Sequence, residues 1–358
     1  MRFALVVGTR PNFVKASAVE RALTARGAEV LLLHTGQHFD PALSDRLFAR
    51  LELPAPAHHL GVSAGSRGDQ FGAIVRGLSA LLPTLRVVEV IVVGDVTSTA
   101  AGAVAADACD LPIAHVEAGL RSFDHSMPEE RNRRVTDVLA SRWFASEPSG
   151  VANLEREGVA PGRVHLVGNV MIDTLLRFRD QALAAAPWQA HGVERGGYAV
   201  ATLHRPGNVD SAGPLAESLA VLGAAARRWP VLFAAHPRTQ ARLREFGLAV
   251  PPGVHLTPPA DYLDFIGLMA GARVVLTDSG GAQEETTALD VPCLTMRDNT
   301  ERPITCELGS SRLIGRELGR AEPLLEDIAA GRYPAARPVP LWDGRAGERI
   351  AGVLMGAR

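Results

Sequence analysis

The order of short apolar runs along the chain is the feature that most constrains its fold. Each run has the length of a strand, and helix-length segments separate most of them. The run Val-Ile-Val-Val before Gly94 is typical of a strand buried on both faces. This alternation predicts βαβ units, with parallel sheets covered by helices on both faces. The predicted strands are residues 3–7, 29–34, 88–93, 112–116, 142–145, 164–167, 198–203, 231–235, 254–257, 273–277 and 292–296.

The length of the chain indicates two domains, because 358 residues exceed the size at which a single core usually keeps growing. Residues 184–197 are rich in Ala, Gly and polar side chains and interrupt the alternation, so we expect a loop there. We predict an α/β protein with two Rossmann-like domains, residues 1–168 and 169–342. The tail, about residues 343–358, predicts one more helix that can pack back on the first domain.

Charge and cysteine content exclude several classes of protein. The 37 basic and 39 acidic residues leave a net charge of −2 without a long run of one sign, which argues against nucleic acid or an anionic membrane as partner. The first apolar run is too short for a signal peptide, and no segment approaches a membrane span, so we expect a soluble cytoplasmic protein. Cys109, Cys293 and Cys306 form no CxxC pair, so neither a disulfide framework nor a zinc site is indicated.

The segment from His115 to Asp137 is unusually dense in charge. A strand that ends at Val116 places Glu117 at the carboxyl edge of its sheet, where open α/β sheets bind ligands. Pro128, followed by Glu129 and Glu130, predicts the first turn of a helix. The alternative is that both glutamates only complement the helix dipole and that the arginines are solvated.

Two other strand ends in the first half carry candidate residues. Asp95 follows the buried strand and can act as a base or hold a sugar hydroxyl, although a helix cap would use the same residue type. After the first strand, Gly8-Thr9-Arg10-Pro11 brings Arg10 and Lys15 to a helix start, where phosphate binds favourably. The spacing matches neither a Walker A loop nor GxGxxG, so an ordinary strand-to-helix turn remains an alternative.

In the second half, two glycines between a strand and a helix predict a phosphate site. Gly280 and Gly281 allow backbone N–H groups to approach an anion closely, and Ser279 adds a hydroxyl. Glu285, about one turn into the helix, can face a ribose or can simply be part of an acidic first turn. Arg302 follows the next strand and reaches the same edge, unless its segment is an ordinary surface loop.

Two histidines end successive strands of this half, in His204-Arg205-Pro206 and His236-Pro237-Arg238. A lone histidine is more often a packed or surface residue than a catalyst. Two His/Arg pairs on neighbouring strand ends would both line a cleft between the domains. They could neutralise or protonate a phosphate leaving group.

Taken together, these motifs resemble the UDP-N-acetylglucosamine 2-epimerases, in particular the non-hydrolysing kind. The match is collinear from Gly8 to about Gly315. It comprises Gly-Thr-Arg-Pro-Asn from Gly8, Thr35-Gly36-Gln37-His38, Gly94-Asp95, His115 to Arg121, Pro128-Glu129-Glu130 with Asn132-Arg133, Gly168-Asn169, His204-Arg205, Asp278 to Glu285 and Thr300-Glu301-Arg302-Pro303.

The resemblance implies two Rossmann-like domains in the glycosyltransferase-B arrangement, an active site between them and a homodimer. It also implies that UDP-GlcNAc and UDP-ManNAc are interconverted with no redox cofactor and no metal. In that family the C2 proton is lost and UDP leaves, which produces 2-acetamidoglucal. UDP then adds back after C2 is protonated on its other face.

The resemblance also assigns roles to individual residues. Asp95, Glu117 and Glu129 would handle the C2 proton, since removal and return on opposite faces need more than one acid/base group. Their mutual repulsion and burial would raise at least one pKa. His204 completes the catalytic set. The family's positions around the departing pyrophosphate are matched by Arg10, Lys15, Arg133, His204 and Arg302; Ser279, Gly280 and Gly281 would hold phosphate, Glu285 the ribose, and Phe265 would lie near the uracil unless it is a core aromatic. We also expect His236 to bind UDP, from its place at the end of the neighbouring strand.

The chain departs from the family pattern at several positions. Gly207 stands where many relatives have a glutamate, and Thr97 where close relatives often have asparagine. Gln37 and His38 match a regulatory pair. Members activated by a second substrate molecule have a further glutamine shortly afterwards, and here Ala42, Ser44 and Asp45 occupy that region, so we expect weak or absent activation.

Three alternatives remain open from the sequence. A hydrolysing epimerase would release ManNAc and UDP. A retaining glycosyltransferase of the same architecture would need an acceptor and would not exchange the C2 proton. A nucleotide-sugar sensor would bind without turnover, but three nearby carboxylates do not favour binding of a pyrophosphate.

Overall fold

The computed structural model describes residues 1–36 and 41–356, with side chains for 1–36 and 46–356. The chain forms two compact units. The first consists of Met1–Thr174 and Pro340–Arg358, and the second of Leu175–Val339. The chain therefore returns to its first unit after completing the second.

The first unit is built on a parallel seven-stranded sheet of order β3-β2-β1-β4-β5-β6-β7. The order reverses between β1 and β4, which is the switch point where ligands bind in such sheets. Its strands are β1 (Arg2–Val7), β2 (Glu29–His34), β3 (His58–His59), β4 (Glu89–Val93), β5 (Ile113–Val116), β6 (Arg142–Ala145) and β7 (Val164–Leu166).

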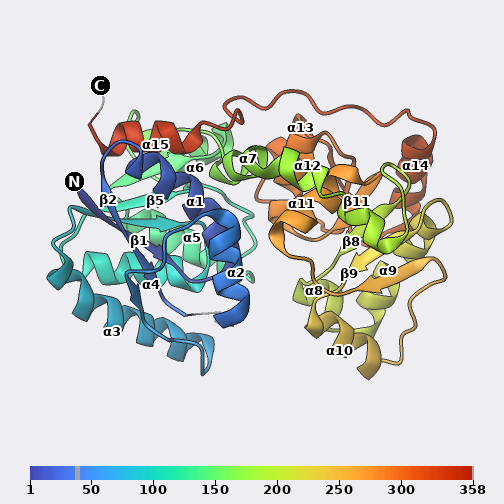
Figure 1. The fold of residues 1–358 in the computed structure, drawn as a ribbon, viewed down its shortest axis with the longest axis horizontal. Helices are drawn as coiled ribbons and strands as arrows, with labels where there is room; N and C mark the ends of the chain where they lie inside the picture. The colour runs from blue at the N-terminus through green and yellow to red at the C-terminus, as the bar shows by residue number, and fades with distance from the viewer. Residues whose placement is uncertain (37–40, 357–358) are drawn as a thin grey trace. The chain divides into compact units, whose positions relative to one another are not determined.

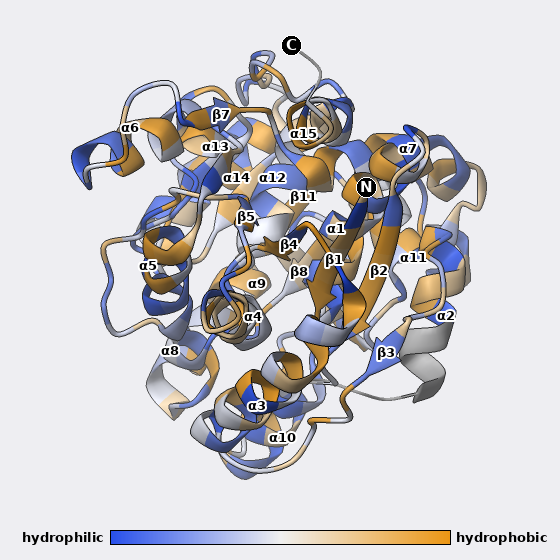
Figure 2. Ribbon diagram, turned by 90° about the vertical axis from the view of Figure 1, so that its left-hand side faces the viewer, coloured by the Kyte–Doolittle hydropathy of each residue, from blue (hydrophilic) through white to orange (hydrophobic). Residues whose placement is uncertain are grey.

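Helices connect these strands and cover the sheet (Figure 1). They are α1 (Arg10–Thr24), α2 (Pro41–Leu51), α3 (Arg67–Leu85), α4 (Thr97–Asp107), α5 (Pro128–Leu139), α6 (Pro148–Arg156), α7 (Val170–Ala184), which continues into the second unit, and α15 (Ala346–Leu354). Every residue of β4 is buried, and Figure 2 shows β1 and β2 as predominantly hydrophobic strands. This agrees with the apolar runs that predicted a sheet covered on both faces.

The second unit repeats the architecture with a parallel six-stranded sheet of order β10-β9-β8-β11-β12-β13. Its strands are β8 (Ala199–Thr202), β9 (Val231–Ala234), β10 (Val254–Thr257), β11 (Val274–Thr277), β12 (Cys293–Thr295) and β13 (Ser311–Leu313). Its helices are the 3₁₀ helix η1 (Pro187–His191), α8 (Pro206–Val209), α9 (Ala212–Ala226), α10 (Pro237–Glu245), α11 (Tyr262–Gly271), α12 (Gly280–Leu289), α13 (Ile304–Glu307) and α14 (Leu318–Ala329).

The predicted fold class, two parallel α/β domains, is confirmed. The structure adds two strands that the sequence analysis missed, β3 and β13, which have two and three residues. A strand of two residues carries no periodic signal, and β13, which reads Ser-Arg-Leu, has only one apolar residue. The segment expected to be a loop contains η1, whose Trp188 is buried in the core of the second unit.

Candidate active site

In the first unit, hydrogen bonds of Asn12, in the first turn of α1, join the ends of β1 and β4. The Asn12 side-chain amide donates to the Val93 carbonyl at 2.8 Å, and the Gly8 N–H donates to Asn12 Oδ1 at 3.3 Å. Arg10 lies exposed at the first position of this helix. The strand-to-helix turn is thus fixed at the switch point of the sheet.

Lys15, one turn further along α1, is buried and its ammonium forms an ion pair with Glu117. Both side chains are at most 5% exposed. The pairing matters because an isolated buried charge would be very costly, whereas two opposite charges in contact offset much of their loss of hydration. The structure therefore brings a predicted phosphate ligand to a predicted proton-handling residue.

The backbone around this pair is unusual. Glu117 has φ of 71°, a left-handed conformation that is uncommon outside glycine and is often found at functional sites. Its N–H donates to the Phe144 carbonyl at 2.9 Å. Gly94 also has φ of 71°, and a Cβ at that position would lie 3.2 Å from Lys15 Nζ. Glycine here allows the ion pair to lie directly against the end of β4.

Asp95 is half-buried beside this pair and does not cap a helix. The N-cap of α4 is Val96, without a side-chain cap, so the capping alternative is not what the fold uses. The Asn132 amide donates to the Asp95 carbonyl at 2.8 Å, and Asp95 Oδ2 lies 3.8 Å from an Arg133 nitrogen. The carboxylate is thus held near a cation while part of its surface stays open.

The two glutamates at the start of α5 differ in environment. Glu129 is half-buried, whereas Glu130 is completely buried. Glu130 accepts hydrogen bonds from the Ser122 N–H at 2.8 Å and the Ser122 hydroxyl at 3.0 Å. Glu130 therefore organises the loop between β5 and α5. Sequence analysis assigned Glu130 no role, since the loop residue that it binds could not be read from spacing.

Arg133 is also buried, with 1% of its side chain exposed, and lies 3.2 Å from Glu130. Its guanidinium nitrogens make ion-pair contacts, but none has a hydrogen-bond partner among the described residues. A guanidinium carries five N–H donors in a fixed fork. Such a group retains the capacity to bind an anion.

In the second unit, Asp278, after the end of β11, contacts several residues of the segment that follows β8. It is fully buried and accepts hydrogen bonds from the backbone N–H groups of His204 and Arg205, at 3.1 and 2.9 Å, and from the Asn208 amide at 3.0 Å. The His204 imidazole Nδ1 lies 2.9 Å from the same carboxylate. Burial raises the pKa of Asp278, but these donors outweigh burial, so the pKa lies below its ordinary value.

This arrangement orients His204. Because Nδ1 faces Asp278, Nε2 is the nitrogen left for a ligand, and the imidazole side chain is 48% exposed. Asp278 was not predicted as a site residue. The signal was present in the motif that begins at Thr277, but only the tertiary structure shows that a residue at the end of β11 binds the turn after β8.

The start of α12 has the predicted geometry of a tight strand-to-helix turn. Ser279 is the N-cap, and its hydroxyl accepts from the Ala282 N–H at 3.3 Å. A Cβ on Gly280 would lie 2.7 Å from Glu301 Oε1, so the backbone approaches its neighbours closely. Glu285 is buried in the second turn, beyond the acidic first turn that was its alternative explanation.

Arg302 lies beneath this turn rather than in the open. It is 4% exposed and forms ion pairs with Glu284 at 2.7 Å and Glu301 at 2.5 Å. The surface-loop alternative describes only the first part of this segment, because Asp298 and Asn299 are exposed whereas Glu301 and Arg302 are buried. These contacts fix the loop after β12 against the start of α12.

The other predicted UDP ligands of this unit occupy two helix starts. His236 is the N-cap of α10, where its Nδ1 accepts from the Arg238 N–H at 3.2 Å. Phe265 is partly buried and packs against the hydrophobic cluster that contains Tyr198 and Trp188. The alternative that Phe265 is a core aromatic therefore holds for the part of its side chain that is buried.

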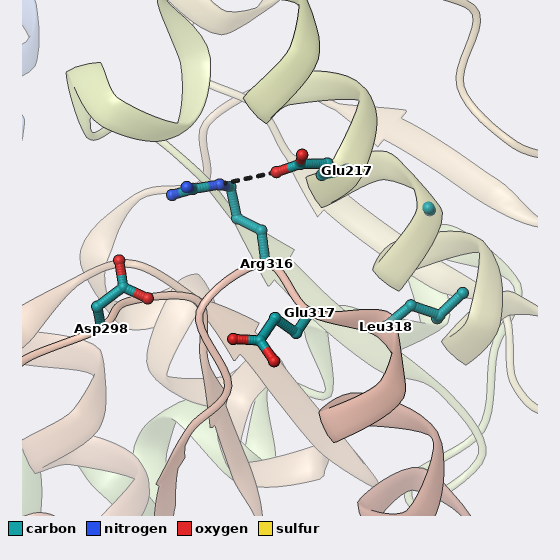
Figure 3. A pocket seen from close by; sticks show the side chains of 6 residues that line it. Glu217, Asp298, Arg316, Glu317 and Leu318 are labelled. Carbon is teal, nitrogen blue, oxygen red and sulfur yellow. Dashed lines mark hydrogen bonds and ion pairs between the residues drawn. The ribbon is translucent and has the colours of Figure 1, made fainter.

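Each unit has a surface hollow. One of about 330 Å³ in the first unit is lined by Arg67, Gly68, Phe71, Thr97, Pro128, Arg131 and Asn132. One of about 350 Å³ in the second unit is lined by Glu217, Ala220, Asp298, Arg316, Glu317 and Leu318. In the second, Arg316 donates to Glu217 at 3.1 Å (Figure 3). Three carboxylates around one arginine make this second hollow a poor place for a pyrophosphate.

Gln37 and His38, the predicted regulatory pair, lie outside the described residues. Within residues 1–36 and 41–356, no group of His, Cys, Asp or Glu side chains is arranged to hold a metal ion. In the same part of the chain, no helix has both the length and the apolar character needed to cross a membrane.

The two parallel sheets, each with polar residues at its carboxyl edge, define a two-domain protein of the glycosyltransferase-B-like class. Comparison with known proteins identifies the family within this class. A family model described as UDP-N-acetylglucosamine 2-epimerase matches residues 21–355.

Individual relatives agree with this match over most of their length. The UDP-N-acetylglucosamine 2-epimerase of Methanocaldococcus jannaschii is 34% identical over 363 residues, with 99% of each chain covered. The UDP-2,3-diacetamido-2,3-dideoxy-D-glucuronate 2-epimerase of Pseudomonas aeruginosa is 36% identical over 321 residues, with 88% of each covered. A crystal structure of the M. jannaschii enzyme in complex with UDP-GlcNAc and UDP has a TM-score of 0.92 at 34% identity, covering 100% of both chains.

This chain belongs to the UDP-N-acetylglucosamine 2-epimerase family. The predicted family and the predicted class of enzyme, an isomerase acting on a nucleotide sugar, are confirmed.

Proposed function

We propose that this chain interconverts UDP-GlcNAc and UDP-ManNAc without hydrolysing them. The C2–H and C1–O bonds break, so that the proton passes to the enzyme and UDP departs with the electron pair of the C1–O bond, leaving 2-acetamidoglucal. A proton then returns to the other face of C2, and UDP adds back to C1. The observation that carries the proposal is the buried Lys15–Glu117 ion pair beside Asp95 at the switch point of the first sheet.

Asp95, Glu117 and Glu129 are the proposed proton-handling residues. Their settings differ, which suits different roles: Glu117 is buried against Lys15, while Asp95 and Glu129 keep part of their surface exposed. A base and an acid that work in one cycle need different affinities for the proton. Lys15 and Arg133 would stabilise negative charge as the phosphate leaves, and Arg10 would add charge at the start of α1.

The second unit would hold UDP. The N–H groups at the start of α12, with Ser279, Gly280 and Gly281, suit the pyrophosphate, and buried Glu285 suits the ribose hydroxyls. His204, oriented by Asp278, would donate to the departing phosphate through Nε2. His236 would add charge, Phe265 would contact the uracil, and Arg302 would support the α12 turn from beneath.

NMR of UDP-GlcNAc incubated with the enzyme in D₂O tests the proposal. We expect deuterium at C2 and formation of UDP-ManNAc, with the UDP linkage retained. Free ManNAc with stoichiometric UDP would instead indicate the hydrolysing reaction. Absence of C2 exchange for every UDP-sugar tried would contradict epimerisation and would favour a glycosyltransferase or a sensor.

A second candidate substrate deserves the same assay. The P. aeruginosa relative is named for UDP-2,3-diacetamido-2,3-dideoxy-D-glucuronate. In this chain Gly207 is exposed, and a Cβ there would meet no atom within 4 Å, so the position can accept variation without repacking. Faster C2 exchange with the diacetamido uronate than with UDP-GlcNAc would reassign the sugar but not the reaction.

Glu117→Gln and Glu129→Gln are each expected to lower turnover at least about 100-fold, the scale of losing an acid/base group. Both variants keep the size of the side chain and remove its ability to exchange a proton. Steady-state rates and C2 exchange in D₂O measure the effect. Asp298→Gln, in the acidic hollow of the second unit, is the control and should stay near wild-type rates. Near-native rates for both glutamate variants would refute their roles.

We further propose a homodimer that uses the outer face of α5. Val135 and Val138 are 43% and 80% exposed on this helix, and Phe123 in the preceding loop is 65% exposed. Apolar side chains gathered at one place are typical of an interface. Light scattering of the full chain tests the assembly.

A cytoplasmic location and weak or absent substrate activation also remain predictions. A sigmoidal dependence of the initial rate on substrate concentration that is lost when Gln37 or His38 is changed would contradict the prediction on activation.

A further inference from the structure

A buried polar contact lies directly beneath the proposed proton-handling residues. His115, on β5, is fully buried, with its Nδ1 2.6 Å from Asp137 Oδ1 and its Nε2 2.8 Å from the Gly94 carbonyl oxygen. Neither Asp137 nor His115 was predicted to be functional. The imidazole thus links α5 to the residue that precedes Asp95.

Both partners of this imidazole are hydrogen-bond acceptors. The Gly94 carbonyl can only accept. Asp137 Oδ2 also lies 2.7 Å from the Arg121 guanidinium and accepts from the Gly119 N–H at 3.1 Å, as an ionised carboxylate does, so Asp137 is an acceptor as well. A neutral imidazole has a single N–H and can donate to one of the two. Only an imidazolium donates to both.

The charges around His115 reduce the free-energy cost of burying an imidazolium. The second oxygen of Asp137 accepts from the Gly119 N–H at 3.1 Å and lies 2.7 Å from the Arg121 guanidinium. Arg121 in turn donates to both oxygens of Glu157, at 2.9 and 2.6 Å. Positive and negative groups therefore alternate from His115 to Glu157, and this offsets the cost of removing each charge from water.

We propose that His115 is a buried imidazolium that acts, with Asp137, as a positioning pair for Asp95 and Glu117. The proposal rests on the proposed function. The His115 ring lies 2.8 Å from the carbonyl of Gly94, the residue before Asp95, and a Cβ on Gly94 would meet both Lys15 and Glu117. His115 also lies on β5, two residues before Glu117, which follows the end of this strand.

The fixed charge would also influence the chemistry. The charged groups that surround this point are Lys15 from α1, Asp95 after β4, Glu117 after β5, Arg121 from the following loop, and Glu130, Arg133 and Asp137 from α5. A nearby positive charge favours the ionised form of a carboxylate. His115 would therefore help to keep Asp95 and Glu117 ready to accept a proton.

The protonation state can be tested without measuring activity. In the full chain labelled with ¹⁵N-histidine, we expect both ring nitrogens of His115 to carry hydrogen, because each of them faces an acceptor. In Asp137→Asn the amide can donate to Nδ1, so the ring should become neutral with its hydrogen on Nε2. The resonance that changes in this variant assigns His115. A neutral His115 ring in the wild type would overturn the proposal.

Steady-state kinetics then test whether His115 and Asp137 position Asp95 and Glu117. Asp137→Asn should lower kcat at least about 10-fold, as expected when reacting groups are misplaced, with KM changed less than about twofold. The acidic limb of kcat/KM should move to higher pH, because Asp95 and Glu117 lose the positive charge that the imidazole carries on its side facing Gly94. A merely structural loss would lower the amount of folded enzyme without moving the pH profile.

Asp173→Asn is the matched control. Asp173 is another buried carboxylate of the first unit, and it accepts backbone N–H groups of Ala346 and Gly347 at 3.1 and 2.7 Å. We expect it to lower stability but to keep the wild-type kcat and pH profile. An unchanged profile in Asp137→Asn, or equal changes in both variants, would overturn the proposal. Absence of C2 exchange in the wild type would instead contradict the proposed function, and the NMR result would still stand.

Discussion

Lys15 and Glu117 illustrate how a single contact changes the role that a residue type suggests. A lysine near the start of a helix predicts a phosphate ligand, and a glutamate at a strand end predicts an acid or base. In the structure the two are buried together as an ion pair. The carboxylate that is proposed to exchange a proton is thus stabilised in its charged form by the cation proposed to meet the leaving group.

His34 provides a prediction at the same scale. Its ring is stacked on His59 with 4.5 Å between ring centroids, and the ring of Phe13 lies 5.2 Å away. Burial, followed by the charge of His59, lowers the pKa of His34 from 6.5 to about 4. Between these values the unfolded chain binds a proton that the folded chain does not. Stability should therefore decrease as the pH falls from about 6.5 to about 4.

Replacing His34 with phenylalanine should remove this contribution, since phenylalanine cannot be protonated. We expect the denaturant midpoint of the variant to depend less on pH in that range than the midpoint of the wild type. His125→Phe, at an exposed position of the same unit, is the control. Parallel pH dependence of His34→Phe and the wild type would contradict the assignment.

At the scale of elements, turns from strand to helix position the candidate residues of each unit. The turn between β4 and α4 combines the left-handed Gly94 with the carbonyl that His115 binds. The turn between β11 and α12 combines a serine cap with a glycine packed against Glu301. In both units a glycine lets the backbone come close to buried charged side chains, where a larger residue would clash.

Gly94→Ala is expected to lower kcat at least about 10-fold and to reduce the free energy of unfolding by about 1–3 kcal/mol. The added Cβ meets Lys15 Nζ and Glu117 Oε2, at 3.2 and 3.4 Å, in a backbone conformation that alanine rarely adopts. Gly27→Ala is the matched control, because Gly27 has φ of 79° but open space around it. It should lose stability and keep its turnover. Equal turnover of the two variants would refute a specific role for Gly94.

At the scale of the whole molecule, the last helix completes the first unit. Helix α15 packs on α1, and both are visible in Figure 1. Asp173 accepts the first two N–H groups of α15, and a Cβ on Gly347 would lie 2.5 Å from the Ala18 carbonyl oxygen. The two helices are therefore in close backbone contact, and the stability of the first unit depends on residues at the opposite end of the chain.

Ile350→Ala should reduce the free energy of unfolding by about 3 kcal/mol, the usual scale for truncating a fully buried isoleucine. Val353→Ala, on the less buried side of the same helix, is the control and should cost less than half as much. Denaturant unfolding followed by the fluorescence of Trp143 and Trp342, both in the first unit, measures the loss. Equal effects of the two substitutions would contradict the packing of α15.

The sequence by itself determined the two parallel sheets, the strand ends that carry polar residues and the family, because these depend on local periodicity, on glycine and on collinear motifs. It did not determine which charges meet. Lys15 and Glu117 are far apart in the chain, and so are His204 and Asp278, yet each pair is in contact. Which charged residues form ion pairs depends on how the elements pack. This cannot be read from the spacing of the residues along the chain. Only the tertiary structure therefore decided that Arg302 lies beneath its turn and that His115 lies beneath the site.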